Sequence, residues 1–124
     1  MTLVFVYGTL KHGCCNHHYL TGQQFLGEAR TAPGFTLYSL GDYPGLVHSG
    51  DPTRQVTGEI WSVTELCLAQ LDQLEGVGEQ LYKRVPISLA PPFDQTAAET
   101  YVYLQGIAGR TELGSDWRDN TNRP

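Results

Sequence analysis

Residues 3–7, Leu-Val-Phe-Val-Tyr, constrain the fold more than any other part of this chain. All five side chains are apolar or aromatic, and Gly8 follows them directly. A strand with one wet face alternates polar and apolar residues, whereas an uninterrupted apolar run is typical of a strand buried on both faces. The sequence therefore predicts a strand at the centre of a sheet.

Other short segments have the β-branched and aromatic content of strands and are bounded by turn residues. They are residues 25–27, 35–40, 46–48, 55–63, 81–89 and 99–105. Within 55–63 the side chains alternate, which indicates a half-buried strand. Pro86 interrupts 81–89, and a proline inside a strand indicates a sheet edge or a bulge.

Residues 64–75 have the pattern of a helix. Thr64 can cap its N-terminus, and Gly76 stands where a left-handed residue commonly ends a helix. Glu75 follows Leu68 and Leu71 at helical spacing, so we expect its carboxylate at the edge of the apolar stripe, directed inward. A second, short helix is expected between Asn16 and Gly22.

The expected strands and helices do not alternate as a βαβ array would require. We therefore predict an α+β fold, a curled mixed sheet or small mixed β-barrel of about six strands with flanking helices. A length of 124 residues suits one core, so residues 1–124 are expected to form a single domain. From about residue 106 onward the chain is a polar tail in which only Trp117 offers an apolar anchor.

Charge and hydropathy argue against several classes of partner. The formal net charge is −5 and no Lys/Arg cluster could neutralise a row of phosphates, so we expect no nucleic-acid partner. No apolar run approaches the ~18 residues of a membrane span, and the N-terminus lacks the features of a signal peptide. Three cysteines, two of them adjacent, do not suggest a disulfide scaffold, and we expect a cytoplasmic protein.

The segment after the first strand is a candidate anion site. It lacks the GxxxxGK[ST] spacing of a phosphate loop, so we reject a nucleotide site. A tight turn at Gly8 could instead expose the backbone N–H groups of Gly8, Thr9 and Leu10 to a carboxylate or an oxyanion. The alternative is an ordinary loop after a strand.

Glu75 is the candidate general base. A carboxylate at a helix C-terminus meets the negative end of the dipole, and partial burial removes hydration, so both effects raise its pKa. The alternative is a solvated glutamate before a C-terminal glycine. Tyr82 follows this helix by one loop and could place its hydroxyl in the same cleft, whereas Asp72 is expected on the wet face and most other tyrosine hydroxyls in water.

A dense group of Cys and His residues lies between the first strand and the expected short helix: His12, Cys14, Cys15, His17 and His18. Zinc or copper could bind such side chains, but structural zinc sites draw ligands from two separated pairs, and no second pair follows. A cysteine nucleophile with a neighbouring histidine as base is a further alternative. We expect a polar loop with no native metal site.

These residues together carry a resemblance to a known family. The matching segments are residues 3–11, Asn16-His17, residues 43–47, residues 58–61, residues 71–76 and residues 81–84. In order and spacing, over roughly residues 2–105, they resemble the gamma-glutamylcyclotransferase-like (AIG2-like) family, and within it the gamma-glutamylamine cyclotransferase branch. The adjacent Cys14 and Cys15 and the tail from residue 106 depart from that pattern.

The resemblance implies a small mixed barrel and an enzyme that cyclises a gamma-glutamyl group to 5-oxoproline and expels an amine. It implies Glu75 as general acid and base, and a small-molecule gamma-glutamyl substrate with no cofactor or metal. The substrate-binding residues that it implies are Tyr7, Gly8, Thr9, Leu10, Tyr43, Pro44, Gly45 and Tyr82, with residues 43–47 as a loop closing over the glutamyl end. The alternative function is a non-catalytic module of the same fold that binds a gamma-glutamyl or other carboxylate ligand.

Overall fold

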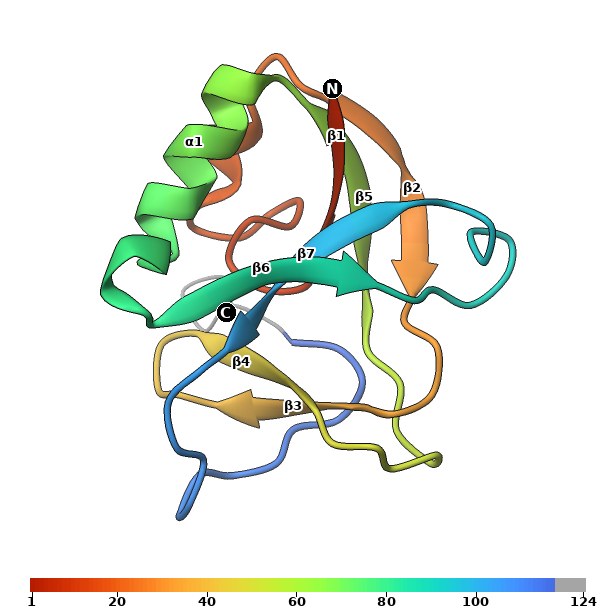
Figure 1. The fold of residues 1–124 in the computed structure, drawn as a ribbon, viewed down its shortest axis with the longest axis vertical. Helices are drawn as coiled ribbons and strands as arrows, with labels where there is room; N and C mark the ends of the chain where they lie inside the picture. Colours follow the sequence, from red (N-terminus) through yellow and green to blue (C-terminus); the bar gives the residue numbers. More distant parts are fainter. Residues whose placement is uncertain (118–124) are drawn as a thin grey trace.

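The computed structural model describes residues 1–117 as a five-stranded mixed sheet with one α-helix and a separate two-stranded hairpin (Figure 1). The sheet has the order β2-β5-β1-β7-β6. Its strands are β1 (Thr2–Val6), β2 (Gln24–Arg30), β5 (Thr57–Val63), β6 (Tyr82–Ile87) and β7 (Ala98–Tyr103). The hairpin consists of β3 (Phe35–Ser39) and β4 (Pro44–His48).

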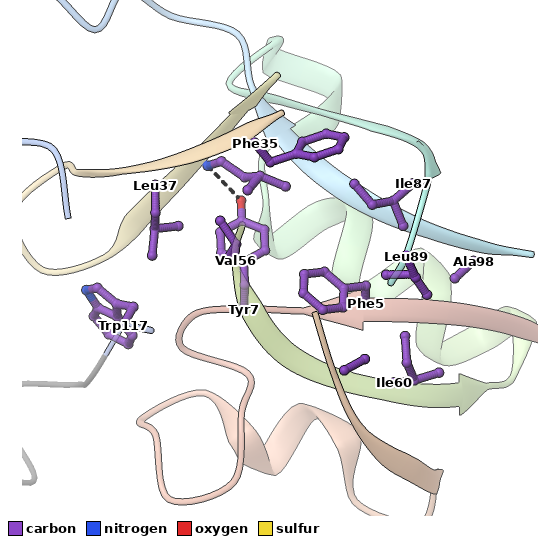
Figure 2. Packing of buried hydrophobic residues seen from close by; sticks show 12 residues of the cluster. Phe5, Tyr7, Phe35, Leu37, Val56, Ile60, Ile87, Leu89, Ala98 and Trp117 are labelled. Atoms are coloured by element: carbon purple, nitrogen blue, oxygen red, sulfur yellow. Dashed lines mark hydrogen bonds between the residues drawn. The ribbon is translucent and has the colours of Figure 1, made fainter. Parts of the chain in front are cut away.

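The run of residues 3–7 forms the central strand that its composition predicts. β1 pairs with β5 in antiparallel and with β7 in parallel orientation, which confirms a mixed sheet. Its side chains alternate between two cores: Val4 and Val6 pack toward α1, whereas Phe5 and Tyr7 pack toward the hairpin. Figure 2 shows the hairpin-side core, in which Phe5 lies near Ile87 and Leu89. Burial on both faces explains why residues 3–6 of the strand are all apolar.

Helix α1 (Glu65–Leu74) ends where the sequence indicates. The Thr64 hydroxyl oxygen accepts a hydrogen bond from the backbone N–H of Cys67 at 3.1 Å, which caps the N-terminus. Gly76 has a φ of +68°, the left-handed conformation that a glycine adopts without steric cost. The helix buries Leu68 and Leu71 against the sheet and leaves Glu75 as its C-terminal cap residue.

The expected barrel is wrong, because the sheet is open between its edge strands β2 and β6. The segments that follow these strands approach each other at one isolated bridge, Thr31–Leu89. Pro33 follows on one side and Pro91 on the other, and a residue without an N–H cannot extend a ladder. The edge position of β6 agrees with the prediction from Pro86.

Three local expectations also change. β5 is buried on both faces rather than half-buried, since α1 and the segment after β1 cover its second face. The expected helix after Asn16 is a single 3-10 turn, η1 (His17–Leu20), because the Asn16 side chain donates to Thr9 instead of capping. β2 extends beyond residues 25–27 to Arg30. A second 3-10 turn, η2 (Val77–Glu79), follows α1.

The described part of the polar tail lies along the hairpin and β5. Leu113 donates its backbone N–H to Leu37 and Ser39 donates its own to Thr111, while Trp117 is buried in the hairpin-side core. Trp117 is thus the anchor that the sequence suggests, and the rest of the tail lies outside the described residues. No helix in residues 1–117 has the length and apolarity needed to cross a membrane.

Candidate active site

A cavity of about 400 Å³ opens where the end of β1, the C-terminus of α1 and the start of β4 meet. It brings together Glu75 with seven of the eight residues expected to bind substrate, Gly45 being the exception. The remaining lining residues are Phe5, Val6, Cys15, Asn16, Asp42, Leu74, Leu81 and Tyr101. None of the described lining residues is a lysine, arginine or histidine, so an anionic ligand would have to be held by neutral donors.

The segment Gly8, Thr9 and Leu10 has the hydrogen bonding of an anion cradle. All three carbonyl oxygens accept hydrogen bonds, from the backbone N–H groups of Lys11 and Asn16 and from Nδ1 of His17. Within residues 1–117, no acceptor is bound to the N–H groups of these three residues. Donors left free in a cavity wall are what a carboxylate or oxyanion requires. We name this segment the cradle.

Gly8 is required by the close approach of β4. A Cβ atom at this position would lie 2.8 Å from Cγ of Pro44, closer than carbon atoms pack in proteins. The first turn of the cradle therefore has room only for a hydrogen, and Pro44 itself forms the facing wall.

Glu75 lies at the C-terminal end of α1, half-buried in the cavity wall. Loss of hydration raises the pKa of its carboxyl to about 7, in the direction expected from the sequence. Within the described chain, no hydrogen-bond donor is bound to this carboxylate. A carboxyl of this pKa is about half ionised at neutral pH, so it can take up a proton and release it again.

Two buried tyrosines fix the walls around Glu75. The Tyr7 hydroxyl donates to the backbone oxygen of Tyr101 at 2.6 Å. It also accepts from the N–H of Leu46 at 3.2 Å, the bond drawn as a dashed line at Tyr7 in Figure 2. The Tyr82 hydroxyl donates to the backbone oxygen of Pro44 at 2.7 Å. Burial, with the nearby Glu75 charge, raises the pKa of both phenols, so they stay protonated. The Tyr7 hydroxyl therefore links the end of β1 to β7 as a donor and to β4 as an acceptor, and the Tyr82 hydroxyl links β6 to β4 as a donor.

The expected closing loop at residues 43–47 is for the most part strand. Tyr43 ends the turn after β3 with 40% of its surface exposed, whereas Pro44 begins β4. Gly45 lies outside the cavity lining, and a Cβ there would meet Leu40 and Tyr103 at 3.0 Å. Glycine is therefore needed at position 45 for close packing against Leu40 and Tyr103, outside the cavity.

Sequence reasoning missed the residues that reach the cavity from distant strands. Tyr101, on β7, lines it and donates its buried hydroxyl to Asp72 at 2.6 Å. Asp72 also pairs with Arg84 at 3.3 Å, so it is a partnered group rather than a wet-face residue, and the Tyr7 and Tyr101 hydroxyls are not in water. This Tyr-Asp-Arg row, of which only Tyr101 is fully buried, gives no local sequence pattern, because its members lie on three separate elements.

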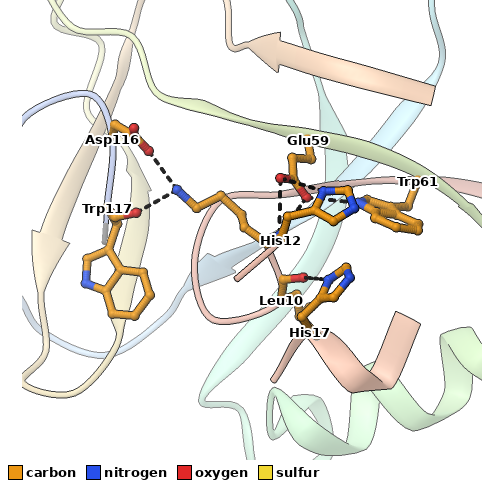
Figure 3. Close-up of polar contacts among 8 residues, drawn as sticks. Leu10, His12, His17, Glu59, Trp61, Asp116 and Trp117 are labelled. Carbon is orange, nitrogen blue, oxygen red and sulfur yellow. Dashed lines mark hydrogen bonds and ion pairs between the residues drawn. The ribbon is translucent and has the colours of Figure 1, made fainter. Parts of the chain in front are cut away.

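The Cys/His group does not converge on one point, although the ring centroids of His12 and His17 lie 4.5 Å apart. His12 bonds to Glu59 and His17 to the Leu10 oxygen (Figure 3). His18 is exposed. Within residues 1–117, no three His, Cys, Asp or Glu side chains lie close enough to hold a metal ion. Cys15 contributes instead to the cavity lining.

The arrangement can bind a small molecule that carries an anionic group and can exchange one proton with it. The cradle provides neutral donors, and Glu75 provides the titrating group in the same cavity. The cavity volume lies within the range for small-molecule sites.

Comparison with known proteins identifies the family of this chain. Residues 4–119 match the family described as "Gamma-glutamyl cyclotransferase, AIG2-like". A Vibrio cholerae protein named "Putative gamma-glutamylcyclotransferase" is 48% identical over 103 residues, which cover 83% of each chain. The "Gamma-glutamylcyclotransferase family protein YtfP" of Escherichia coli K12 is 36% identical over 117 residues, 94% of this chain and 96% of its own.

Solved structures agree with the fold. The solution structure of ytfP from Escherichia coli superposes with a TM-score of 0.71 at 36% identity, covering 97% of this chain and 99% of that one. The crystal structure of an AIG2-like protein from mouse gives a TM-score of 0.69 at 31% identity, over 86% and 78% of the two chains. The chain therefore belongs to the gamma-glutamyl cyclotransferase, AIG2-like family, which makes it a cyclotransferase-type enzyme.

Proposed function

We propose that this protein cyclises a gamma-glutamyl group to 5-oxoproline and releases an amine or amino acid, with Glu75 as general base and acid. In this reaction the α-amine of the substrate attacks its own γ-carbonyl carbon. One C–N bond closes the five-membered ring and the amide C–N bond to the leaving amine breaks. Because nucleophile and carbonyl belong to one molecule, no protein nucleophile, metal or cofactor is needed.

The proton moves in the direction that the chemistry requires. Glu75, ionised, takes a proton from the α-ammonium and so frees the lone pair for attack. The attacking nitrogen then carries positive charge and loses a second proton to solvent as the ring forms. The proton held by Glu75 passes to the departing nitrogen, so the amide C–N bond breaks, the amine leaves neutral and Glu75 is ionised again. A carboxyl with a pKa of about 7 suits both steps, because neither protonation state is strongly favoured at neutral pH.

The cradle supplies the complementary charge stabilisation. N–H groups of Gly8, Thr9 and Leu10 hold the glutamyl carboxylate and the oxygen that gains negative charge during attack. Tyr43, Pro44 and Tyr82 form the surrounding wall, and Tyr7 contributes its ring while its hydroxyl stays bonded within the core.

The observation that carries this proposal is that one cavity contains both a desolvated carboxylate and a row of N–H groups, none of which has a hydrogen-bond partner among residues 1–117. A purely structural loop would leave neither group without a protein partner, since unpaired polar groups are costly in an enclosed site. Family membership supports the same reaction class.

The proposal is tested by incubating the purified protein with a panel of gamma-glutamyl amines and dipeptides and measuring 5-oxoproline by mass spectrometry. We expect product with the native protein and a loss of turnover of at least about a thousandfold in Glu75→Gln, because the variant cannot accept a proton. Glu79→Gln is the matched control, since Glu79 is exposed beyond the helix end and should retain native activity.

The non-catalytic alternative gives a different result in the same experiment. A binding module would raise the melting temperature with gamma-glutamyl ligands while yielding no 5-oxoproline from any of them. Full activity in Glu75→Gln would exclude Glu75 as the base.

A further inference from the structure

A carboxylate buried outside the cavity has no role in the proposed chemistry. Glu59 lies in the middle of β5 with only 8% of its surface exposed. The residue that faces it on β2 is Glu28, and like charges opposite each other in a ladder are unfavourable. Burial of a carboxylate also costs free energy unless donors replace its hydration. Strand pairing therefore does not account for an acid at this position.

The groups that compensate this carboxylate belong to His12 and Trp61. The backbone N–H of His12 lies 3.1 and 3.2 Å from the two Glu59 carboxylate oxygens, and Nδ1 of His12 lies 3.2 Å from one of them (Figure 3). Nε1 of Trp61 donates to the other oxygen at 3.1 Å. Two of the three groups that contact the carboxylate thus belong to His12, two residues beyond the end of the cradle.

His12 is one end of a braced segment. At the other end, Tyr7 is fixed by its two hydroxyl hydrogen bonds. Between them, Lys11 closes a turn onto the Gly8 oxygen, and its Nζ binds Asp116 at 2.7 Å and the Trp117 oxygen at 2.6 Å (Figure 3). Asn16 holds Thr9 through both backbone and side chain. The cradle thus owes its shape to anchors on both sides, and Glu59 is the buried anchor contributed by the sheet.

We propose that Glu59 is a positioning residue for the cradle, acting through the backbone N–H of His12 to keep the free N–H groups of residues 8–10 directed at the ligand. The inference rests on the proposed function for the identity of that ligand, but its geometry stands on the contacts of Glu59 alone. Donors fixed before the ligand arrives need no reorganisation, and a shift of about 1 Å at such a site costs about a hundredfold in rate.

The test compares Glu59→Gln with Glu28→Gln. In Glu59→Gln the amide nitrogen would face donors that now meet carboxylate oxygen, so at least one contact to His12 is lost. We expect kcat/KM for 5-oxoproline formation to fall about tenfold to a hundredfold, and 5-oxoproline itself to bind about tenfold more weakly. Glu28 is exposed on the neighbouring strand and contacts neither His12 nor the cavity, so its variant should retain native kcat/KM and 5-oxoproline binding. Removal of the like charge opposite Glu59 should not lower its stability.

A backbone readout separates positioning from general destabilisation. Asn16 donates its amide to the Thr9 oxygen at 2.8 Å and does not touch Glu59, so its hydrogen exchange reports on the cradle. We expect exchange at Asn16 to quicken about tenfold in Glu59→Gln while amides in α1 keep native rates. His12→Ala retains the backbone N–H and should leave exchange at Asn16 near native.

The outcomes are separable from those of the proposed function. The inference is overturned if Asn16 exchange in Glu59→Gln equals that in Glu28→Gln, or if the cradle loosens while 5-oxoproline binds with native affinity. If the native protein neither forms nor binds 5-oxoproline, the proposed function fails, and exchange at Asn16 alone decides whether Glu59 positions the cradle.

Discussion

At the scale of single residues, the site depends on groups that the surrounding protein leaves without partners. Glu75 has no donor bound to it within the described chain, and its carboxyl pKa is raised to about 7 by lost hydration. The cradle has free N–H groups because its carbonyl oxygens, and not its nitrogens, are used for internal bonding. These unpaired groups cost stability, and a bound ligand would remove that cost.

The raised pKa of Glu75 predicts a pH dependence of stability. A carboxyl whose pKa is higher in the folded than in the unfolded protein binds more protons when folded, so the free energy of unfolding falls as pH rises from about 4.5 to about 7. Glu75→Gln removes this penalty and should gain roughly 1 to 3 kcal/mol over the native protein at pH 8, with little gain at pH 4. Urea unfolding at the two pH values measures the difference. An equal effect at both would contradict the desolvated carboxylate.

The close approach of Pro44 to Gly8 predicts that Gly8→Ala lowers both the stability of the protein and its ligand binding. Its Cβ would lie 2.8 Å from Pro44, so β4 or the cradle has to shift. We expect a loss of about 1 to 3 kcal/mol in unfolding free energy and weaker binding of 5-oxoproline, measured by thermal shift and calorimetry. Gly106→Ala is the control, because nothing lies within 4 Å of its added Cβ and no change beyond about 0.5 kcal/mol is expected.

At the scale of elements, α1 is the part that carries Glu75 to the cavity. Its N-terminus is fixed by the Thr64 hydroxyl, and its C-terminus ends at a left-handed Gly76, so the helix has defined limits at both ends. Leu68 and Leu71 pack against Val4 and the rest of the helix-side core, which fixes the rotation of the helix. Glu75 is therefore directed by the packing of residues one and two turns earlier.

The Thr64 cap of α1 is expected to contribute measurably to the free energy of unfolding. Thr64→Ala removes the acceptor for the Cys67 N–H and should lower the free energy of unfolding by about 1 kcal/mol. Thr64→Ser keeps the hydroxyl and should retain most of the stability. Chemical denaturation of the three proteins makes the comparison, and equal losses in both variants would mean that the methyl group, rather than the cap, is what matters.

The contacts of Lys11 with Asp116 and Trp117 lead to a second prediction at the scale of elements, which concerns stability. Lys11 is buried and binds both Asp116 and the Trp117 oxygen, so it holds this segment against the cradle. Lys11→Met should cost about 1 to 3 kcal/mol, since charged hydrogen bonds are lost and the Trp117 oxygen loses its donor. Lys83→Met, on an exposed position of β6, serves as the comparison, and equal melting temperatures for the two variants would contradict this role.

At the scale of the whole molecule, sequence periodicity predicted the individual strands and the helix better than it predicted whether the sheet closes into a barrel. The run of residues 3–7 predicted a central strand because burial on both faces excludes polar residues, and Thr64 and Gly76 predicted the helix ends because caps are local. The barrel was wrong, because closure depends on whether β2 and β6 meet, and those strands are far apart in the chain. Local pattern carries no information about that contact.

The same division holds for the site. Local sequence pattern identified Gly8 and Glu75 as candidate site residues, since a turn glycine and a helix-end carboxylate are local features. Tyr101 and Glu59 were missed as site components because their roles depend on contacts across the sheet, Tyr101 with Asp72 and Glu59 with His12. The alternation in residues 55–63 predicts a strand with one exposed face, where a glutamate is ordinary, so the sequence alone does not indicate the burial of Glu59.

The central claim is that the amine of the substrate closes the ring on its own γ-carbonyl. The most direct test is to incubate a gamma-glutamyl amine with the protein in water enriched in oxygen-18 and to identify the products by mass spectrometry. Ring closure predicts equal amounts of free amine and 5-oxoproline, with no oxygen-18 incorporated. Glutamate that carries oxygen-18 in its γ-carboxyl would mean that water is the nucleophile, and would contradict the account.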